Sequence, residues 1–155
     1  LNDLGWLAED KQEYAAASQY YNESLAIFRQ IANRHSIANT LTNLSFVYLT
    51  LYDWSNALNT LQEALALARD LAATLIMLEL LVGFARLRYL EGDWPFAANL
   101  LGMITAHPQL HDDGKTRIAA FLPELERQLG PEEINRLMEQ GRALVMADVV
   151  RDLVN

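Results

Sequence analysis

Aromatic residues recur in this sequence at a constant interval, and no other feature restricts the possible folds as strongly. They are Tyr14, Trp54 and Trp94, whose residue numbers differ by 40 each time. Each of them is followed three positions later by an alanine, namely Ala17, Ala57 and Ala97. A fixed period of this length is typical of proteins that stack helical repeats into a solenoid. The sequence therefore predicts a repeat protein with at least three units.

Apolar residues at three- and four-residue intervals predict a helix on each side of every aromatic corner. The expected helix pairs span about residues 1–33, 36–71 and 73–106. In the first helix, Leu1, Leu4, Leu7 and Ala8 share one face. No alternation of apolar and polar residues persists long enough to indicate a strand. The chain is therefore expected to be all-helical.

The corners carry local signals for the ends of helices. Asp53 and Asp93 are expected N-caps, because a carboxylate oxygen can accept the free N–H groups of the following helix. Gly92 suits the left-handed residue that ends a helix, and Pro95 suits the first helical turn.

The last third of the chain, residues 107–155, lacks the aromatic period. It is expected to form C-terminal capping helices. One helix is expected from Gly114 to Leu129, with a kink at Pro123. Another is expected to start at Pro131 and to end at Gly141, and residues 147–153 are expected to form a short closing helix. Such a tail would cover the open apolar edge of the last repeat.

The corner sequences resemble those of tetratricopeptide repeats. In the second copy, seven residues match the packing positions of that family: Leu41, Leu44, Ser45, Tyr48, Ala57, Leu61 and Ala64. The resemblance implies an all-α fold, a right-handed α–α superhelix of three helix pairs plus a C-terminal helical cap. The usual period of the family is shorter, about 34 residues. The additional residues of this chain are expected to lengthen the second helix of each pair and its link to the next pair.

The tail is similar to the carboxyl-terminal end of bacterial regulatory ATPases of the LuxR-type and AfsR-like STAND groups. The resemblance rests on residues 97–102, Leu129-Gly130 and residues 139–144. It implies that the chain is a piece of a larger bacterial transcriptional regulator, in which a helical-repeat sensor follows a nucleotide-binding switch and serves signal transduction.

The resemblance also places the binding surface, since the first helix of each tetratricopeptide pair lines the concave side of the stack. The side chains expected to face this groove are Asn2, Trp6, Glu9, Asn39, Thr42, Asn43, Phe46, Thr50, Glu79, Val82, Arg86 and Tyr89. Aromatic rings supply contact area, and amides and hydroxyls can hydrogen-bond a peptide backbone or the polar groups of a small molecule. In the alternative interpretation, Trp6 and Phe46 are simply buried, either by longer helices or by a neighbour that is missing from this sequence.

The charge distribution excludes several classes of function. The net charge is −8, divided into −4 for residues 1–72 and −4 for residues 73–155, and no basic stripe stands out. Direct binding to nucleic acid is not expected, because it depends on clustered Lys and Arg. The most apolar segment, residues 71–81, is too short to span a membrane. No signal peptide opens the chain and there is no cysteine, so a cytoplasmic location is expected.

The sequence assembles no catalytic, cofactor or metal site. Gly114-Lys115-Thr116 imitates the end of a phosphate-binding loop, but Gln109 stands where that motif requires glycine. His107 and His111 have the spacing of two metal ligands on one helix, but Pro108 interrupts that helix. We therefore expect no enzyme activity, no cofactor and no metal.

The expected function is a non-catalytic protein-interaction or effector-sensing module that binds a peptide, a protein or a small inducer on its concave face. The alternative is a structural scaffold or oligomerisation segment, whose apolar surfaces pack against its own polypeptide or a second copy.

Overall fold

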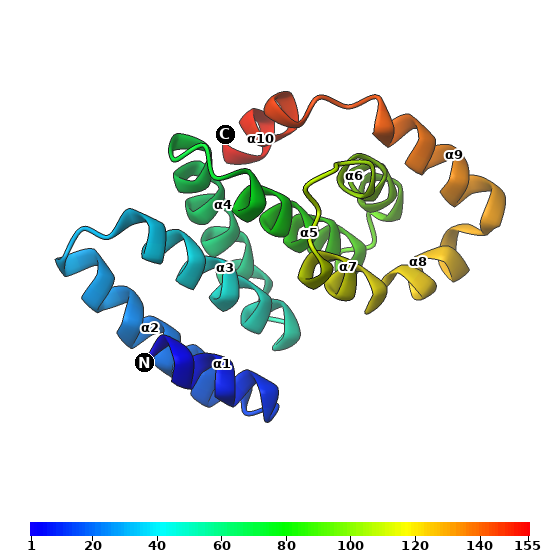
Figure 1. The fold of residues 1–155 in the computed structure, drawn as a ribbon. Coiled ribbons are helices and arrows are strands. Elements are labelled where there is room, and N and C mark those ends of the chain that lie inside the picture. The colour runs from blue at the N-terminus through cyan, green and yellow to red at the C-terminus, as the bar shows by residue number, and fades with distance from the viewer. The chain divides into compact units, whose positions relative to one another are not determined.

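The computed structural model describes residues 1–155 as ten α-helices without a β-strand (Figure 1). The helices are α1 (Asn2–Asp10), α2 (Tyr14–Gln30), α3 (Arg34–Thr50), α4 (Trp54–Asp70), α5 (Thr74–Leu90), α6 (Trp94–Thr105), α7 (Asp112–Ala119), α8 (Leu122–Leu129), α9 (Pro131–Arg142) and α10 (Met146–Val154). The predicted fold class, an all-α helical repeat, is confirmed.

The repeat is built from helices of equal length. Helices α2, α3, α4 and α5 each contain 17 residues, and a three-residue corner follows every helix from α1 to α5. One helix and one corner make a step, and two such steps make the full period of the aromatic residues. The additional residues do not lengthen the second helix alone, contrary to the prediction, because α3 and α4 have the same length.

All five corners close in the same way. One residue in each corner has a positive φ: Gln12 (61°), Ala32 (54°), Tyr52 (58°), Ala72 (52°) and Gly92 (86°). The N–H of the next residue then donates to the carbonyl five positions earlier, as from Asp53 to Tyr48 at 2.9 Å. This is the left-handed helix ending that favours glycine. The prediction for Gly92 is confirmed, and four other residues adopt the same conformation.

The predicted N-caps are also confirmed. The carboxylates of Asp53 and Asp93 accept hydrogen bonds at 3.3 Å from the backbone N–H groups of Asn56 and Phe96. A cap that was not predicted is Asn33, whose side chain accepts the N–H of Ser36 at 3.1 Å. Each cap satisfies an N–H group that the first helical turn would otherwise leave unpaired.

The four non-glycine corners contain residual backbone strain, which a substitution can measure. Replacing exposed Ala72 by glycine is expected to stabilise the protein by about 0.5–1 kcal/mol. Glycine removes the steric cost of the left-handed conformation in the folded state, and this gain exceeds the entropy that the more flexible glycine loses on folding. Gly92→Ala is expected to do the opposite, since no atom lies within 4 Å of its added Cβ and only the φ of 86° opposes it. Urea denaturation of both variants measures these effects, and equal signs for the two would contradict the explanation.

The chain consists of two compact units, Leu1–Ile76 and Met77–Asn155. The boundary falls within the first turn of α5. The division into a repeat region, 1–106, and a capping region, 107–155, stays a prediction.

The first unit is centred on Tyr21 of α2. Its ring is fully buried, and it packs with Ala8, Ala17, Leu44 and Val47. Gly5 of α1 lies directly against the ring, because a Cβ at that position would be 2.5 Å from a ring carbon. The Tyr21 hydroxyl donates a 2.5 Å hydrogen bond to the carboxylate of Glu9. Tyr21 therefore holds both halves of the short helix α1.

In the second unit, α6 and α9 approach each other at backbone distance. A Cβ on Gly102 would overlap the carbonyl oxygen of Met138 and lie 2.7 Å from its carbonyl carbon. A Cβ on Gly141 would overlap the carbonyl oxygen of Asn99 in the same way. The prediction that Gly141 ends its helix is wrong, since α9 continues to Arg142. Gly141 is required there because only a residue without a side chain permits this contact.

The rest of the tail differs from the prediction in one place. The expected helix over 114–129 is divided into α7 and α8, and Pro123 lies in the first turn of α8 instead of at a kink. Proline is well tolerated there, because the N–H it lacks would have no partner within the helix. Gly130, with φ 82°, ends α8, and the predicted closing helix is confirmed as α10.

Candidate functional site

The twelve predicted groove residues lie on α1, α3 and α5, and several occupy equivalent positions of the repeat. Trp6, Phe46 and Arg86 are equivalent to one another, as are Asn2, Thr42 and Val82. The structure places these equivalent side chains in different surroundings. Because α1 and α3 belong to the first compact unit and most of α5 to the second, the two parts are described separately.

Trp6 and Phe46 differ most clearly. The side chain of Trp6 is 63% exposed, whereas Phe46 is 3% exposed. The interpretation that these aromatic residues are buried by helices of the repeat holds for Phe46. For Trp6, burial by a neighbouring segment outside residues 1–155 stays a prediction. Thr42 and Val82 are buried like Phe46. The expectation that Thr42, Phe46 and Val82 face an open groove is wrong.

The burial of Thr42 and Phe46 follows from the position of α3. Both α2 and α4 pack against this helix, and its buried residues cover most of its circumference, leaving the side of Asn39 and Asn43 less covered. The hydroxyl of Thr42 donates to the carbonyl of Ala38 at 2.8 Å, so it does not need a ligand. Thr50 is satisfied in the same way by the carbonyl of Phe46 at 2.9 Å.

On the first unit, Trp6 is the exposed tryptophan of α1, and α3 carries two asparagine amides. The hydroxyl of Thr40 donates to the side-chain oxygen of Asn2 at 3.2 Å, which places the beginning of α1 against the first half of α3. Helices α1 and α3 both run antiparallel to α2 and therefore run in the same direction. One helical turn beyond Asn2 and Thr40, Trp6 of α1 is level with Asn43 of α3. Asn43 is half-buried and Asn39 is exposed. We call Trp6, Asn39 and Asn43 the Trp6 face.

Glu9 belongs to the predicted site but already has a structural role. Its carboxylate accepts the hydrogen bond of the buried Tyr21 hydroxyl. This leaves the indole of Trp6 and the two amides as the groups of the first unit that are best placed to contact a partner.

On α5, the predicted groove side chains face the protein's own tail. Tyr89 stacks on Phe121, which follows α7, with ring centroids 5.6 Å apart. Near the beginning of α5, burial raises the pKa of the Glu79 carboxyl; Arg117 of α7 opposes that rise, and nearby Asp113 adds to it. Arg86 is half-buried. Helix α7 and the residues around it therefore occupy the side of α5 that was predicted to bind a ligand.

The raised pKa of Glu79 predicts a dependence of stability on pH. The folded protein binds the Glu79 proton more tightly than the unfolded chain, whose ordinary value is 4.5. Glu79 therefore contributes stability that is fully present below about that pH and is lost as the pH rises through the folded pKa. Relative to Glu79→Gln, the wild-type protein is expected to gain stability as the pH falls from the pKa of Glu79 in the folded protein to about 4.5. Urea denaturation at a series of pH values measures the difference, and a difference independent of pH would contradict it.

A second apolar surface lies at the amino-terminal edge of the first unit. Leu1, Leu4 and Leu7 of α1 are 44%, 45% and 41% exposed. The predicted common face with buried Ala8 is therefore only partly confirmed. The equivalent residues of the next pair are Leu41, Leu44 and Val47, and none of them is more than 1% exposed. Comparison of equivalent positions shows that the three leucines of α1 lie where the next pair packs against its neighbour.

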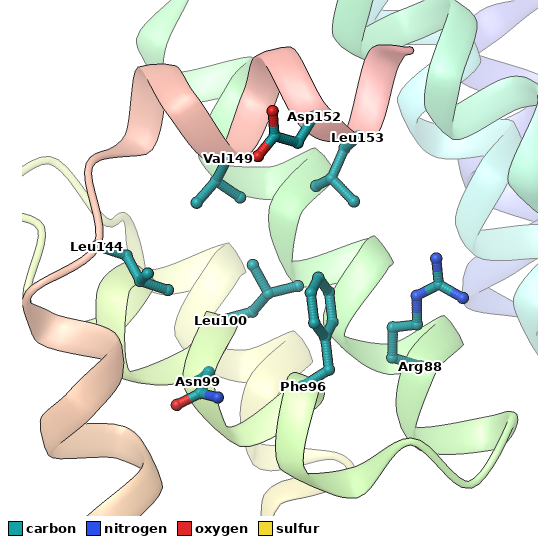
Figure 2. A pocket seen from close by; sticks show the side chains of 8 residues that line it. All are labelled: Arg88, Phe96, Asn99, Leu100, Leu144, Val149, Asp152 and Leu153. Carbon is teal, nitrogen blue, oxygen red and sulfur yellow. The ribbon is translucent and has the colours of Figure 1, made fainter.

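The second unit contains a cavity of about 380 Å³ that was not predicted (Figure 2). It is lined by Arg88, Phe96, Asn99, Leu100, Leu144, Val149, Asp152 and Leu153. These residues come from α5, α6, the segment after α9, and α10, so no interval in the sequence connects them. The fold of the second unit brings them together around one space.

The two patterns that imitate chemical sites do not form such sites. His107 and His111 lie between α6 and α7, outside any helix, and the Nδ1 atom of His107 accepts the N–H of Gln109 at 3.2 Å. Gly114-Lys115-Thr116 lies inside α7, where Lys115 pairs with Asp112 at 3.2 Å. The structure contains no group of three or more His, Asp or Glu side chains placed to hold a metal ion.

Comparison with known proteins identifies one family. Residues 1–70 match the tetratricopeptide repeat family. No curated protein and no solved structure matches the chain. None of the helices combines the length and the apolar composition that a membrane span requires. The family match covers α1 to α4, where the equal helices and identical corners recur, and it supports a tetratricopeptide repeat domain in this part of the chain.

Proposed function

We propose that this chain is a non-catalytic interaction module that binds a protein or peptide through the Trp6 face. Tetratricopeptide repeat domains generally mediate interactions between proteins. The observation that carries the proposal is the 63% exposure of Trp6, a large aromatic side chain on α1.

The composition of the Trp6 face suits recognition of a polypeptide. An indole ring buries a large apolar area when a partner covers it, and tryptophan is enriched among residues that dominate binding energy. The amides of Asn39 and Asn43 each offer donors and an acceptor, which match the N–H and C=O groups of a peptide backbone. The face contains no charged side chain, so we expect a partner segment that contacts it mainly through apolar and backbone groups.

The resemblance of the tail to bacterial regulatory ATPases supports a more specific role. We propose that the module belongs to a larger transcriptional regulator in which it senses an effector. Binding of a protein, a peptide or a small inducer would then change how the repeats pack on the switch domain. Expression of the complete reading frame tests this role. A regulator of this kind requires a nucleotide-binding domain or a DNA-binding domain in the same polypeptide as the repeats. A complete protein without either would contradict it.

Peptide selection tests the Trp6 face directly. A displayed peptide library is selected on the immobilised protein, and the affinity of the tightest peptide is then measured for variants. Trp6→Ala is expected to weaken binding about 30-fold or more, as for a residue that dominates an interface. Its thermal unfolding should change little, because the side chain is exposed. Trp54→Ala is the matched control, since Trp54 is 41% exposed but is the first residue of α4 and does not belong to the Trp6 face. Binding that survives Trp6→Ala would contradict the proposal.

The exposed leucines of α1 favour a second candidate, a scaffold whose amino-terminal edge packs against a second copy. Leu4 and Leu7 are exposed where the equivalent Leu44 and Val47 pack on α2. In this case the protein should self-associate, and Leu4→Asp with Leu7→Asp should restore the monomer. Leu51→Asp is the control, because Leu51 is similarly exposed (44%) but lies at a corner. Sedimentation equilibrium measures the mass, and a monomeric wild-type protein at high concentration would exclude this candidate.

A further inference from the structure

The cavity of the second unit has an apolar interior. Val149 and Leu153 point from α10 toward Leu100 and Phe96 of α6, and Leu144 closes one side (Figure 2). Leu100 is 1% exposed and forms the floor. Leu144 and Asp152 are exposed, so the space is open to solvent along α10. The space has a volume of about 380 Å³.

The charges around the cavity have a net negative sign. The guanidinium of Arg88 pairs with Glu91 at 2.8 Å and lies 5.6 Å from the centre of the Phe96 ring. Its charge is therefore balanced. Arg151 is shared between two carboxylates, Asp148 at 2.8 Å and Asp152 at 3.3 Å. One negative charge remains unbalanced on α10, and Asp152 is the carboxylate that lines the cavity.

We propose that this cavity binds a small molecule that combines an apolar body with a protonated amine. The apolar body would be covered by Phe96, Leu100, Leu144, Val149 and Leu153, and the amine would pair with Asp152. The volume lies in the range of small-molecule sites, which are mostly apolar and contain a few polar groups that fix the orientation of the ligand. The positive charge of Arg88 would repel a second positive charge at the other end of the ligand. This site is separate from the Trp6 face and does not depend on the function proposed for it.

Three fluorescent probes of similar aromatic body and different charge test the site. Dansylcadaverine carries a primary amine, dansylamide is neutral, and anilinonaphthalene sulfonate is an anion. Titration of the full chain should give saturable binding that is tightest for dansylcadaverine and weakest for the anion. Asp152→Asn is expected to weaken dansylcadaverine about fivefold, the effect of one partly exposed ion pair, and to leave dansylamide unchanged. Asp148→Asn is the matched control, because it removes the same charge from α10 outside the cavity.

A variant that fills the cavity tests the location. Val149→Trp should abolish binding of dansylcadaverine and dansylamide, because its side chain projects into the space that they would occupy. If that variant does not fold, Leu144→Phe fills the cavity from its exposed side and should have the same effect. Binding that survives a folded filling variant would overturn the site. Tighter binding of the anion, or equal losses with Asp148→Asn and Asp152→Asn, would overturn the assignment of an amine.

Discussion

Replacing Gly102 by alanine is expected to destabilise the second unit by about 2–4 kcal/mol, although alanine is the better helix former. The added Cβ would overlap the carbonyl oxygen of Met138, and backbone atoms of a packed helix cannot move aside as a flexible side chain can. Helices α6 and α9 would have to separate, which removes contacts along both. A loss of this size is a large fraction of the stability of a small domain.

Gly114→Ala is the matched control for that substitution. Gly114 is also a buried helical glycine, but its nearest neighbour is the flexible end of the Leu110 side chain, 2.7 Å from the added Cβ. This variant is therefore expected to be close to neutral or slightly stabilising, by up to about 1 kcal/mol from helix propensity. Urea denaturation followed by circular dichroism measures both variants. A Gly102→Ala protein as stable as Gly114→Ala would show that α6 and α9 are not in backbone contact.

Replacing Tyr21 by alanine is expected to cost about 3–5 kcal/mol, as for other large buried aromatic residues. The ring is fully buried in the core of the first unit, and it contacts Gly5 and supports Glu9 on α1. Helix α1 contains only nine residues and is too short to be stable alone. Loss of Tyr21 should therefore release α1, which carries Trp6, before the remaining helices unfold.

Hydrogen exchange distinguishes this local effect from general loss of stability. In Tyr21→Ala, amides of α1 should exchange faster than those of α3 and α4, whereas Tyr21→Phe keeps the packing and should cost only about 1–2 kcal/mol through the hydrogen bond to Glu9. Equal exchange throughout the unit in Tyr21→Ala would contradict the role assigned to the ring.

The corners were the most predictable part of the fold, because their structure is determined by neighbouring residues. A capping carboxylate and a glycine act within one helical turn, so Asp53, Asp93 and Gly92 could be identified from the sequence alone. Ala32, Tyr52 and Ala72 adopt the same left-handed conformation as Gly92 although their side chains disfavour it. Their role becomes apparent only from the regular step between corners, which is half the period of the aromatic residues.

The candidate site was less predictable, because burial depends on packing between elements that are distant in the sequence. Trp6 and Phe46 occupy the same position of the repeat, but within residues 1–155 α3 packs against both α2 and α4, whereas α1 packs mainly against α2. Glu79 and Tyr89 have the pattern of groove residues, and nothing in their local sequence shows that α7 and Phe121 cover them. Gly141 has the pattern of a helix end because glycine is common there, whereas close contact with α6 requires it.

The proposed function requires that a partner contacts the first unit through Trp6. The chain contains three tryptophans, Trp6, Trp54 and Trp94, so labelling with 5-fluorotryptophan gives three ¹⁹F resonances that single substitutions can assign. Titration with a peptide selected on the wild-type protein should shift the Trp6 resonance and leave Trp54 and Trp94 in place, because those two residues begin α4 and α6 and lie outside the Trp6 face. A shift of Trp54 or Trp94 without a change at Trp6 would contradict the claim.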